Sequence, residues 1–135
     1  MSSYRLSTAA TVILILAAGP TAHAQQGRSY DCLVTSKLNS DGYTYSAEDL
    51  KRGQFSVRVT ETSSGVATIS RCSFVQRLNQ VTCDPYLADH VSVDSNAGLR
   101  KYYVFGGQFD VQIFSSGHFV ENNGRGGLAF GNCTP

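Results

Sequence analysis

This sequence lacks any block of like charge. Lys and Arg number 11 and Asp and Glu number 10, so the formal net charge is only +1 at pH 7, and the two signs are interspersed. A general nucleic-acid binder needs a basic stripe, and a protein that lies on a membrane surface needs a cationic face. The charge pattern therefore argues against nucleic acid and membrane as partners.

The sequence has only one long apolar run, which lies at the amino terminus. This run, Leu6–Ala18, follows a short positively charged start and is closed by a Gly-Pro pair. At about a dozen residues it is shorter than the roughly 20 that a membrane-spanning helix needs. Ala22 and Ala24 are the small residues that a signal peptidase accepts, so residues 1–24 have the pattern of a cleavable secretory signal. We expect cleavage between Ala24 and Gln25 and a periplasmic or secreted mature protein.

Closely spaced cysteines are also missing. The four cysteines of the chain are 40, 11 and 50 residues apart, whereas structural zinc motifs pair cysteines about two to four residues apart. In an exported domain an even number of cysteines indicates disulfides, and four cysteines allow three connectivities. We favour Cys72–Cys83, which flanks a hairpin-like segment, together with Cys32–Cys133, which joins the first strand to the last.

No long segment has the 3.6-residue period of an amphipathic helix, which argues against α/β and helical-bundle folds. The only expected helix is short and spans Ser46 to Arg52, with Ser46 as its cap and Asp49 in the position that completes a capping box. Turn dipeptides recur instead at short intervals, among them Asp41-Gly42 and Asn123-Gly124. Such punctuation is typical of a series of short strands.

Between the turns, apolar and polar residues alternate. The clearest case is the segment from Gln108 to Phe114, where Phe109, Val111 and Ile113 share one face, as in a strand that is buried on one side. Residues 55–60 and 91–94 show a similar pattern. We predict a single all-β domain over residues 25–135, with seven or eight short antiparallel strands that form a small barrel or a sandwich.

Catalytic and metal-binding signatures are absent from the sequence. There is no Gly-x-Ser-x-Gly motif, and the Asp89-His90 pair does not define a triad, because a triad is set by geometry and not by adjacency. His118 and Glu121 are three residues apart, which places them on opposite faces of a strand. We therefore predict no catalytic residue, no metal ligand and no cofactor.

The end of the chain carries a resemblance to a class of known proteins. Residues 119–133 are rich in glycine and end in Gly131-Asn132-Cys133. Together with Cys32, this ending resembles small exported bacterial proteins that finish in a glycine-x-cysteine strand, and it implies a β fold closed by an end-to-end disulfide. Bacterial lysozyme inhibitors are similar in size, compartment and disulfide content, but their serine-glycine and tyrosine motifs are not found here.

These observations favour a non-enzymatic module that binds a protein partner, with an inhibitor of a hydrolase as the example that we consider. Loops on a rigid scaffold are the usual place for recognition, and tyrosines often line such surfaces. Tyr43, Tyr45 and Arg125 are the surface residues that we single out. The alternative is a carrier that holds a small molecule inside a closed barrel, and a small hydrolase is a third class.

Overall fold

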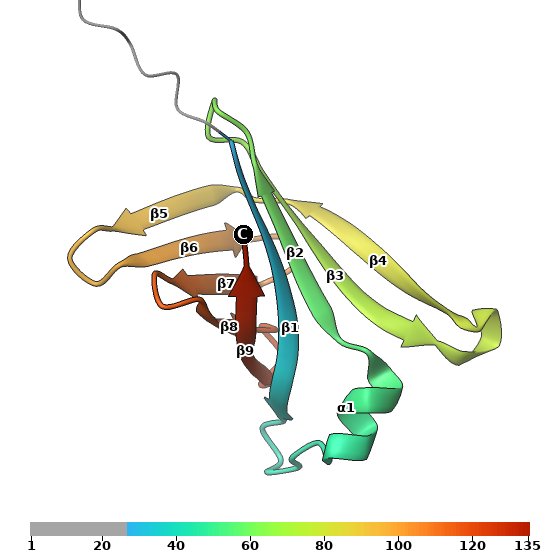
Figure 1. The fold of residues 1–135 in the computed structure, drawn as a ribbon. Helices are drawn as coiled ribbons and strands as arrows, with labels where there is room; N and C mark the ends of the chain where they lie inside the picture. The colour runs from blue at the N-terminus through green and yellow to red at the C-terminus, as the bar shows by residue number, and fades with distance from the viewer. Residues whose placement is uncertain (1–26) are drawn as a thin grey trace, which may run out of the picture.

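The computed structural model describes residues 27–135, so the predicted signal and its cleavage site at Ala24 and Gln25 lie outside the described residues. The described chain forms one antiparallel sheet and one short helix (Figure 1). The strands are β1 (Arg28–Leu38), β2 (Ser56–Glu61), β3 (Ala67–Val75), β4 (Gln80–Leu87), β5 (His90–Asp94), β6 (Leu99–Val104), β7 (Phe109–Phe114), β8 (His118–Asn122) and β9 (Leu128–Thr134). The helix α1 (Ala47–Gly53) connects β1 to β2, and a 3₁₀ turn (Gln76–Leu78) connects β3 to β4.

The all-β class is confirmed, but the predicted count of seven or eight strands is wrong, because the sheet has nine. The edge strand β4 shows why the sequence gives too low a count. Most of its residues are exposed on both faces, so its sequence lacks the alternation that marks a half-buried strand. Pro85 lies within β4, and an edge strand is where proline is tolerated, because an edge residue does not need to donate to a second neighbour.

The sheet is curled into a half-barrel, with the order β4-β3-β2-β1-β9-β8-β7-β6-β5. The first and last strands lie side by side at its centre, and β4 and β5 form its two edges (Figure 1). Only Ala88 and Asp89 connect these edges. The Ala88 amide donates to Ala67 O on one side, at 2.9 Å, and the Asp89 amide donates to Tyr103 O on the other, at 2.8 Å. The two edges therefore meet at this point, but β4 and β5 do not pair as neighbouring strands.

The two disulfides connect neighbouring strands. Cys32 of β1 is bonded to Cys133 of β9, and Cys72 of β3 is bonded to Cys83 of β4, which is the connectivity favoured by the sequence. Two disulfides are typical of a protein in an oxidising environment. Within residues 27–135 no helix is long and apolar enough to cross a membrane.

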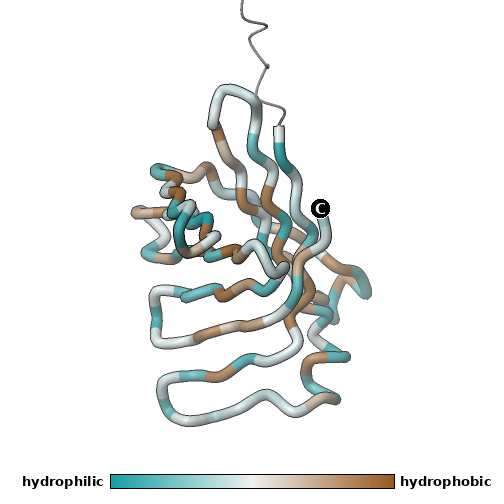
Figure 2. The backbone as a smooth tube through the Cα atoms, turned by 60° about the vertical axis from the view of Figure 1, so that its left-hand side comes forward, coloured by the Kyte–Doolittle hydropathy of each residue, from teal (hydrophilic) through white to brown (hydrophobic). Residues whose placement is uncertain are grey.

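The concave face of the half-barrel carries the core. Apolar and polar residues alternate along most strands, as Figure 2 shows by the change between brown and teal. Phe109 and Phe119 point inward and are buried, and Tyr102 is fully buried. Phe130, which the sequence predicts to face inward with the other phenylalanines, lies instead on the outer face between buried Ala129 and Gly131.

A β-bulge in β1 determines which side chains in the last part of this strand face the interior. Val34 pairs with Gly131 and Ser36 pairs with Phe130, so Thr35 is an extra residue on β1. One extra residue exchanges the faces of all the residues that follow. Because of the bulge, Lys37 faces the interior beside Ala129, on the same side of the sheet as Cys32 and Val34.

Gly131 sits opposite this bulge, on β9, close to the backbone of β1. A Cβ atom at Gly131 would lie 1.9 Å from Leu33 O and 2.7 Å from the Phe119 ring. We expect Gly131→Ala to lower the free energy of unfolding by about 1–3 kcal/mol, because the sheet must shift to relieve the overlap. Chemical denaturation measures this change. Gly106→Ala, where a Cβ would meet nothing within 4 Å, is the control and should change stability by less than about 0.5 kcal/mol.

Candidate functional site

Two ion pairs cross the interior of the half-barrel. The first joins β2 to β6. Arg100 Nε and Nη2 donate to the two carboxylate oxygens of Glu61 at 2.8 and 2.7 Å, and the Tyr102 hydroxyl donates to Glu61 Oε2 at 3.0 Å. These hydrogen bonds from Arg100 lower the pKa of Glu61, whereas burial raises the pKa of Tyr102. Since both carboxylate oxygens accept hydrogen bonds, this pair is fully satisfied and has a structural role.

The second ion pair joins β3 to β8 and is not satisfied in the same way. Arg71 Nε lies 2.5 Å from Glu121 Oε1, and the Glu121 side chain is only 7% exposed. The approach is not aligned as a hydrogen bond, so this buried oxygen accepts none. The guanidinium of Arg71 also lies over the ring of Phe109, 4.9 Å from its centroid. An oxygen of this kind is available to a further donor.

Lys37 is the third charged residue of this region. Its Nζ lies 4.0 Å from the centroid of the Phe55 ring and 4.9 Å from that of Tyr45. Burial lowers the pKa of Lys37, and the opposing effect of Glu121 is smaller. Within the described residues Lys37 forms no ion pair. The lysine is therefore a partly desolvated cation that lies against two aromatic faces, with Glu121 and Arg71 also close enough to affect its pKa.

These groups surround a pocket of about 210 Å³. Its lining residues are Val34, Lys37, Phe55, Ser56, Arg71, Cys72, Ser73, Asp84, Glu121 and Ala129. Asp84 is exposed on the edge strand, so water solvates its carboxylate. The buried part of the pocket thus presents two cations, one carboxylate oxygen without a hydrogen bond, and an aromatic wall. We call it the interior pocket.

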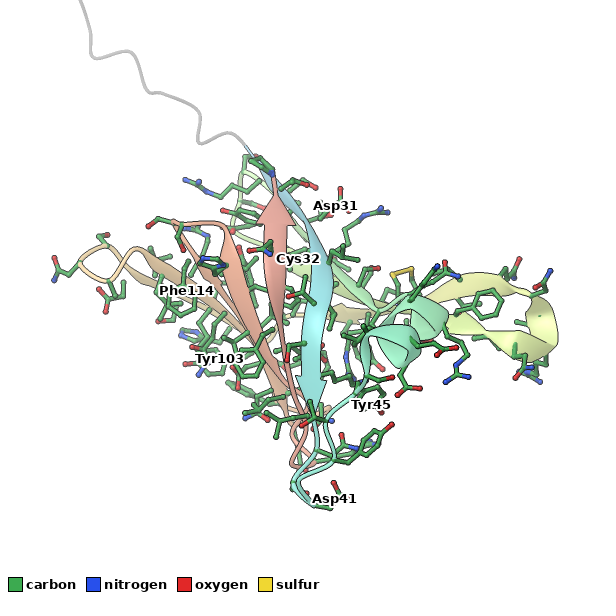
Figure 3. All side chains as sticks on the ribbon, turned by 60° about the horizontal axis from the view of Figure 1, so that its bottom comes forward. Asp31, Cys32, Asp41, Tyr45, Tyr103 and Phe114 are labelled. Atoms are coloured by element: carbon green, nitrogen blue, oxygen red, sulfur yellow. A yellow bond between two sulfur atoms is a disulfide. The ribbon has the colours of Figure 1, made fainter. Side chains whose placement is uncertain are left out.

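A second candidate lies on the outside of the sheet, where the β3–β4 hairpin extends past α1 (Figure 1). The Cys72–Cys83 disulfide closes its base and is visible as a yellow bond in Figure 3. Beyond the disulfide, every residue from Gln76 to Val81 is exposed.

Apolar side chains gather along this projection. Leu78 is 50% exposed, Val81 is 42% exposed, and Val81 pairs with half-buried Phe74 on the outer face. Leu33 of β1, which is 61% exposed, and Val81 line the same groove of about 590 Å³ beside α1. Leu33, Phe74, Leu78 and Val81 form what we call the outer apolar strip. Contiguous exposed apolar surface of this kind marks an interaction site more often than isolated residues do.

The tyrosines singled out from the sequence lie next to α1. Ser46 and Asp49 form the expected capping box, in which Asp49 N donates to Ser46 Oγ and Ser46 N donates to Asp49 Oδ2. The Tyr43 hydroxyl donates to Asp49 Oδ2 at 3.0 Å. Hydrogen bonds, first from Ser46 and then from Tyr43, lower the pKa of Asp49 to about 2. Tyr43 is half exposed, and its hydroxyl is hydrogen-bonded to the helix cap.

The structure brings Tyr45 to the interior pocket. Its ring packs edge-on against Tyr43 on one side, at 5.2 Å, and against Phe55 on the other, at 5.8 Å. In Figure 3 Tyr45 lies near the end of β1 and far from Tyr103, on the other side of the view. Tyr45 therefore lies beside Lys37, whereas Arg125 is exposed in the β8–β9 turn.

The histidines stand apart from one another. His90 lies on the outer face, with its ring 5.7 Å from that of Tyr103, while Asp89 Oδ2 accepts a hydrogen bond from the Phe105 amide. His118 is exposed and neighbouring Glu121 is buried, as expected for opposite faces of a strand. In the described part of the chain, no three His, Cys, Asp or Glu residues are grouped as metal ligands.

Sequence reasoning missed the interior pocket. Glu121 carries a partial signal, since it alternates with Phe119 on a strand and so shares the apolar face. Lys37 carries none, because only the bulge turns it inward. The hairpin was recognised as a disulfide-flanked segment, but its exposure depends on its length beyond the sheet, which the sequence does not give.

Comparison with known proteins identifies no relative. No family model matches the chain, and neither a curated protein nor a solved structure does.

Proposed function

We propose that this protein is an exported, non-enzymatic binding module that docks on a protein partner through the β3–β4 hairpin. The observation that carries the proposal is the outer apolar strip, whose residues Leu78 and Val81 project beyond the sheet on a segment closed by a disulfide. The partner is a protein with a cleft that receives the hairpin tip, such as an exported hydrolase, for which the module acts as an inhibitor.

The stapled hairpin suits this role because it is ordered before binding. The disulfide fixes residues 73–82 as a closed loop, and β3 is anchored in the sheet by its pairing with β2. Asn79, at the tip, has a positive φ of 49° that reverses the chain. A loop that is already in its bound conformation loses less entropy on binding, and this raises affinity.

The positive charges beside the outer apolar strip indicate which kind of protein partner it suits. Lys51 lines the groove beside the strip, and Arg77 is exposed at the hairpin tip. Cations at the rim of an apolar patch favour a partner with acidic groups around its cleft, and they accelerate association at low salt. Two disulfides and the signal pattern support the periplasm or the extracellular space as the place of this encounter.

Leu78→Asp is the variant that tests the proposal. We expect partner binding to weaken by about 30-fold or more, because a charge replaces an apolar anchor at the centre of the contact. The partner is first captured from exported proteins by a photo-crosslinker placed at position 78. Its affinity for the purified wild type and variant is then measured by calorimetry.

Val66→Asp is the matched control. Val66 is 51% exposed and precedes β3 at the end opposite the hairpin tip. Binding should survive this change. Two results would contradict docking through the hairpin. One is an equal loss of partner affinity for the two variants, and the other is that the partner captured at position 78 binds Leu78→Asp as tightly as it binds the wild type.

A further inference from the structure

We infer that the interior pocket binds a small hydroxy acid, with its carboxylate held by Lys37 and Arg71 and its hydroxyl donating to Glu121. This ligand site is distinct from the outer apolar strip and does not depend on a protein partner. It gives specific residues to the carrier hypothesis.

The carboxylate is assigned from Lys37 and Arg71, the two cations that line the pocket. Arg71 contacts Glu121 through Nε, which leaves its terminal nitrogens without an ion-pair partner among the described residues. Lys37 Nζ lies against the Phe55 and Tyr45 rings and forms no ion pair in the described part of the chain. Burial lowers its pKa, although Glu121 is close enough to offset part of that effect. A carboxylate between these two side chains would receive a planar fork from the arginine and a point charge from the lysine. It would also compensate the burial that lowers the pKa of Lys37.

The hydroxyl is assigned from Glu121. This residue is 6% exposed, and its Oε1 is buried without a hydrogen bond. Leaving a buried acceptor unsatisfied costs about 1–3 kcal/mol, and more when it is charged. A neutral donor on the ligand satisfies the oxygen and adds no second cation beside Arg71. A hydroxyl group meets both conditions.

Size limits the ligand further. The pocket of about 210 Å³ is below the roughly 300–1,000 Å³ that is typical of sites for drug-sized ligands. Phe55, Val34 and Ala129 form an apolar part of a pocket whose lining is otherwise mostly polar, which suits an acid with a short carbon chain. The pocket therefore fits a short-chain hydroxy acid rather than a sugar chain or a lipid.

Lactate and propionate provide a direct test, because they differ only in the hydroxyl group. Titration of the ¹⁵N-labelled mature protein, monitored by amide chemical shifts, should show saturable lactate binding with shifts around Lys37, Arg71 and Glu121. Propionate should bind about tenfold more weakly, since it leaves Glu121 Oε1 unsatisfied. Glycerol, which has hydroxyls but no charge, should not bind.

Two variants locate the site. Lys37→Gln should weaken lactate binding by at least about tenfold, whereas Arg58→Gln should leave it unchanged, because Arg58 is exposed on the outer face beside Asp31. Lactate shifts no larger than those caused by propionate or by sodium chloride at the same concentration would overturn the assignment. This comparison uses the wild-type protein, so it holds even if a variant fails to fold.

Discussion

Replacing Cys32 and Cys133 with alanine is expected to lower the free energy of unfolding by about 4–5 kcal/mol. The disulfide connects positions 101 residues apart. A bond that closes a loop of about 100 residues lowers the conformational entropy of the unfolded chain, and this stabilises the folded protein by roughly that free energy. A domain of this size has only about 5–15 kcal/mol in total. Urea denaturation of the oxidised wild type and the double variant measures the difference.

The position of this disulfide makes its loss more severe than the loop length alone implies. Every other strand pairing joins two strands that follow one another in the chain, whereas β1 and β9 come from opposite ends of the described chain. Cys32 and Cys133 lie directly opposite one another on that one long-range pairing. Removing the bond therefore leaves two local groups of strands, β1–β4 and β5–β9, held together by packing, by hydrogen bonds and by the short Ala88-Asp89 connection.

The Cys72–Cys83 bond provides the comparison. It spans only 11 residues, so the corresponding double alanine variant should lose about 3 kcal/mol at most. A larger loss for this variant than for the central pair would contradict the account. So would four reactive thiols in the non-reduced mature protein, because they would show that neither bond forms.

Glu61→Gln is expected to lower the free energy of unfolding by about 3 kcal/mol. The substitution leaves Arg100, whose side chain is only 14% exposed, as a largely buried cation without its carboxylate. Breaking a buried pair by removing one partner costs about 3–5 kcal/mol because the remaining charge is uncompensated. Thermal or urea unfolding at pH 7 measures the loss.

The same pair gives a pH dependence of definite sign. The hydrogen bonds from Arg100, more than any other cause, lower the pKa of Glu61 below its ordinary value of 4.5. The unfolded chain therefore takes up this proton at a higher pH than the native protein does. The stabilisation is complete above the pKa of the unfolded state and disappears as the pH falls through the lower native pKa. The stability difference between wild type and Glu61→Gln should shrink accordingly in acid.

Asp31→Asn tests whether burial, rather than distance, decides the size of the effect. Asp31 and Arg58 are 2.6 Å apart, as close as the buried pair, but their side chains are 57% and 61% exposed. An exposed pair of this kind contributes about 1 kcal/mol or less. If Asp31→Asn destabilised the protein as much as Glu61→Gln, the distinction drawn between the two pairs would be wrong.

Local patterns in the sequence predicted the elements that depend on local physics. The alternation from Gln108 to Phe114 begins one residue before β7 and ends with it, and the expected helix from Ser46 to Arg52 differs from α1 by one residue at each end. The Asp-Gly and Asn-Gly pairs lie in turns, where Gly42 and Gly124 have positive φ angles. Each of these features is decided by residues close together in the chain.

The parts that the sequence did not predict depend on register between distant strands. The extra residue at Thr35 is a bulge only relative to Gly131 and Phe130, almost 100 residues later. Whether Lys37 faces the core or the solvent follows from that register and from nothing in its immediate neighbours. Arg71 and Glu121 likewise meet because the sheet curls, and an alternation pattern contains no information on curvature.

Because β1 pairs with β9, the order of the strands in the sheet matches their order in the chain once β9 is treated as followed by β1. Read from β5 through β9, then β1 to β4, the sheet is a simple succession of neighbours. Asp31 pairs with Thr134, so the two ends of the described chain emerge side by side. A short linker between them and a new opening at Ala88-Asp89 would give a circular permutant in which every strand follows its neighbour. The described chain differs from that permutant in one respect: its first and last strands lie at the centre of the sheet, where a covalent bond between Cys32 and Cys133 joins them in place of a peptide connection.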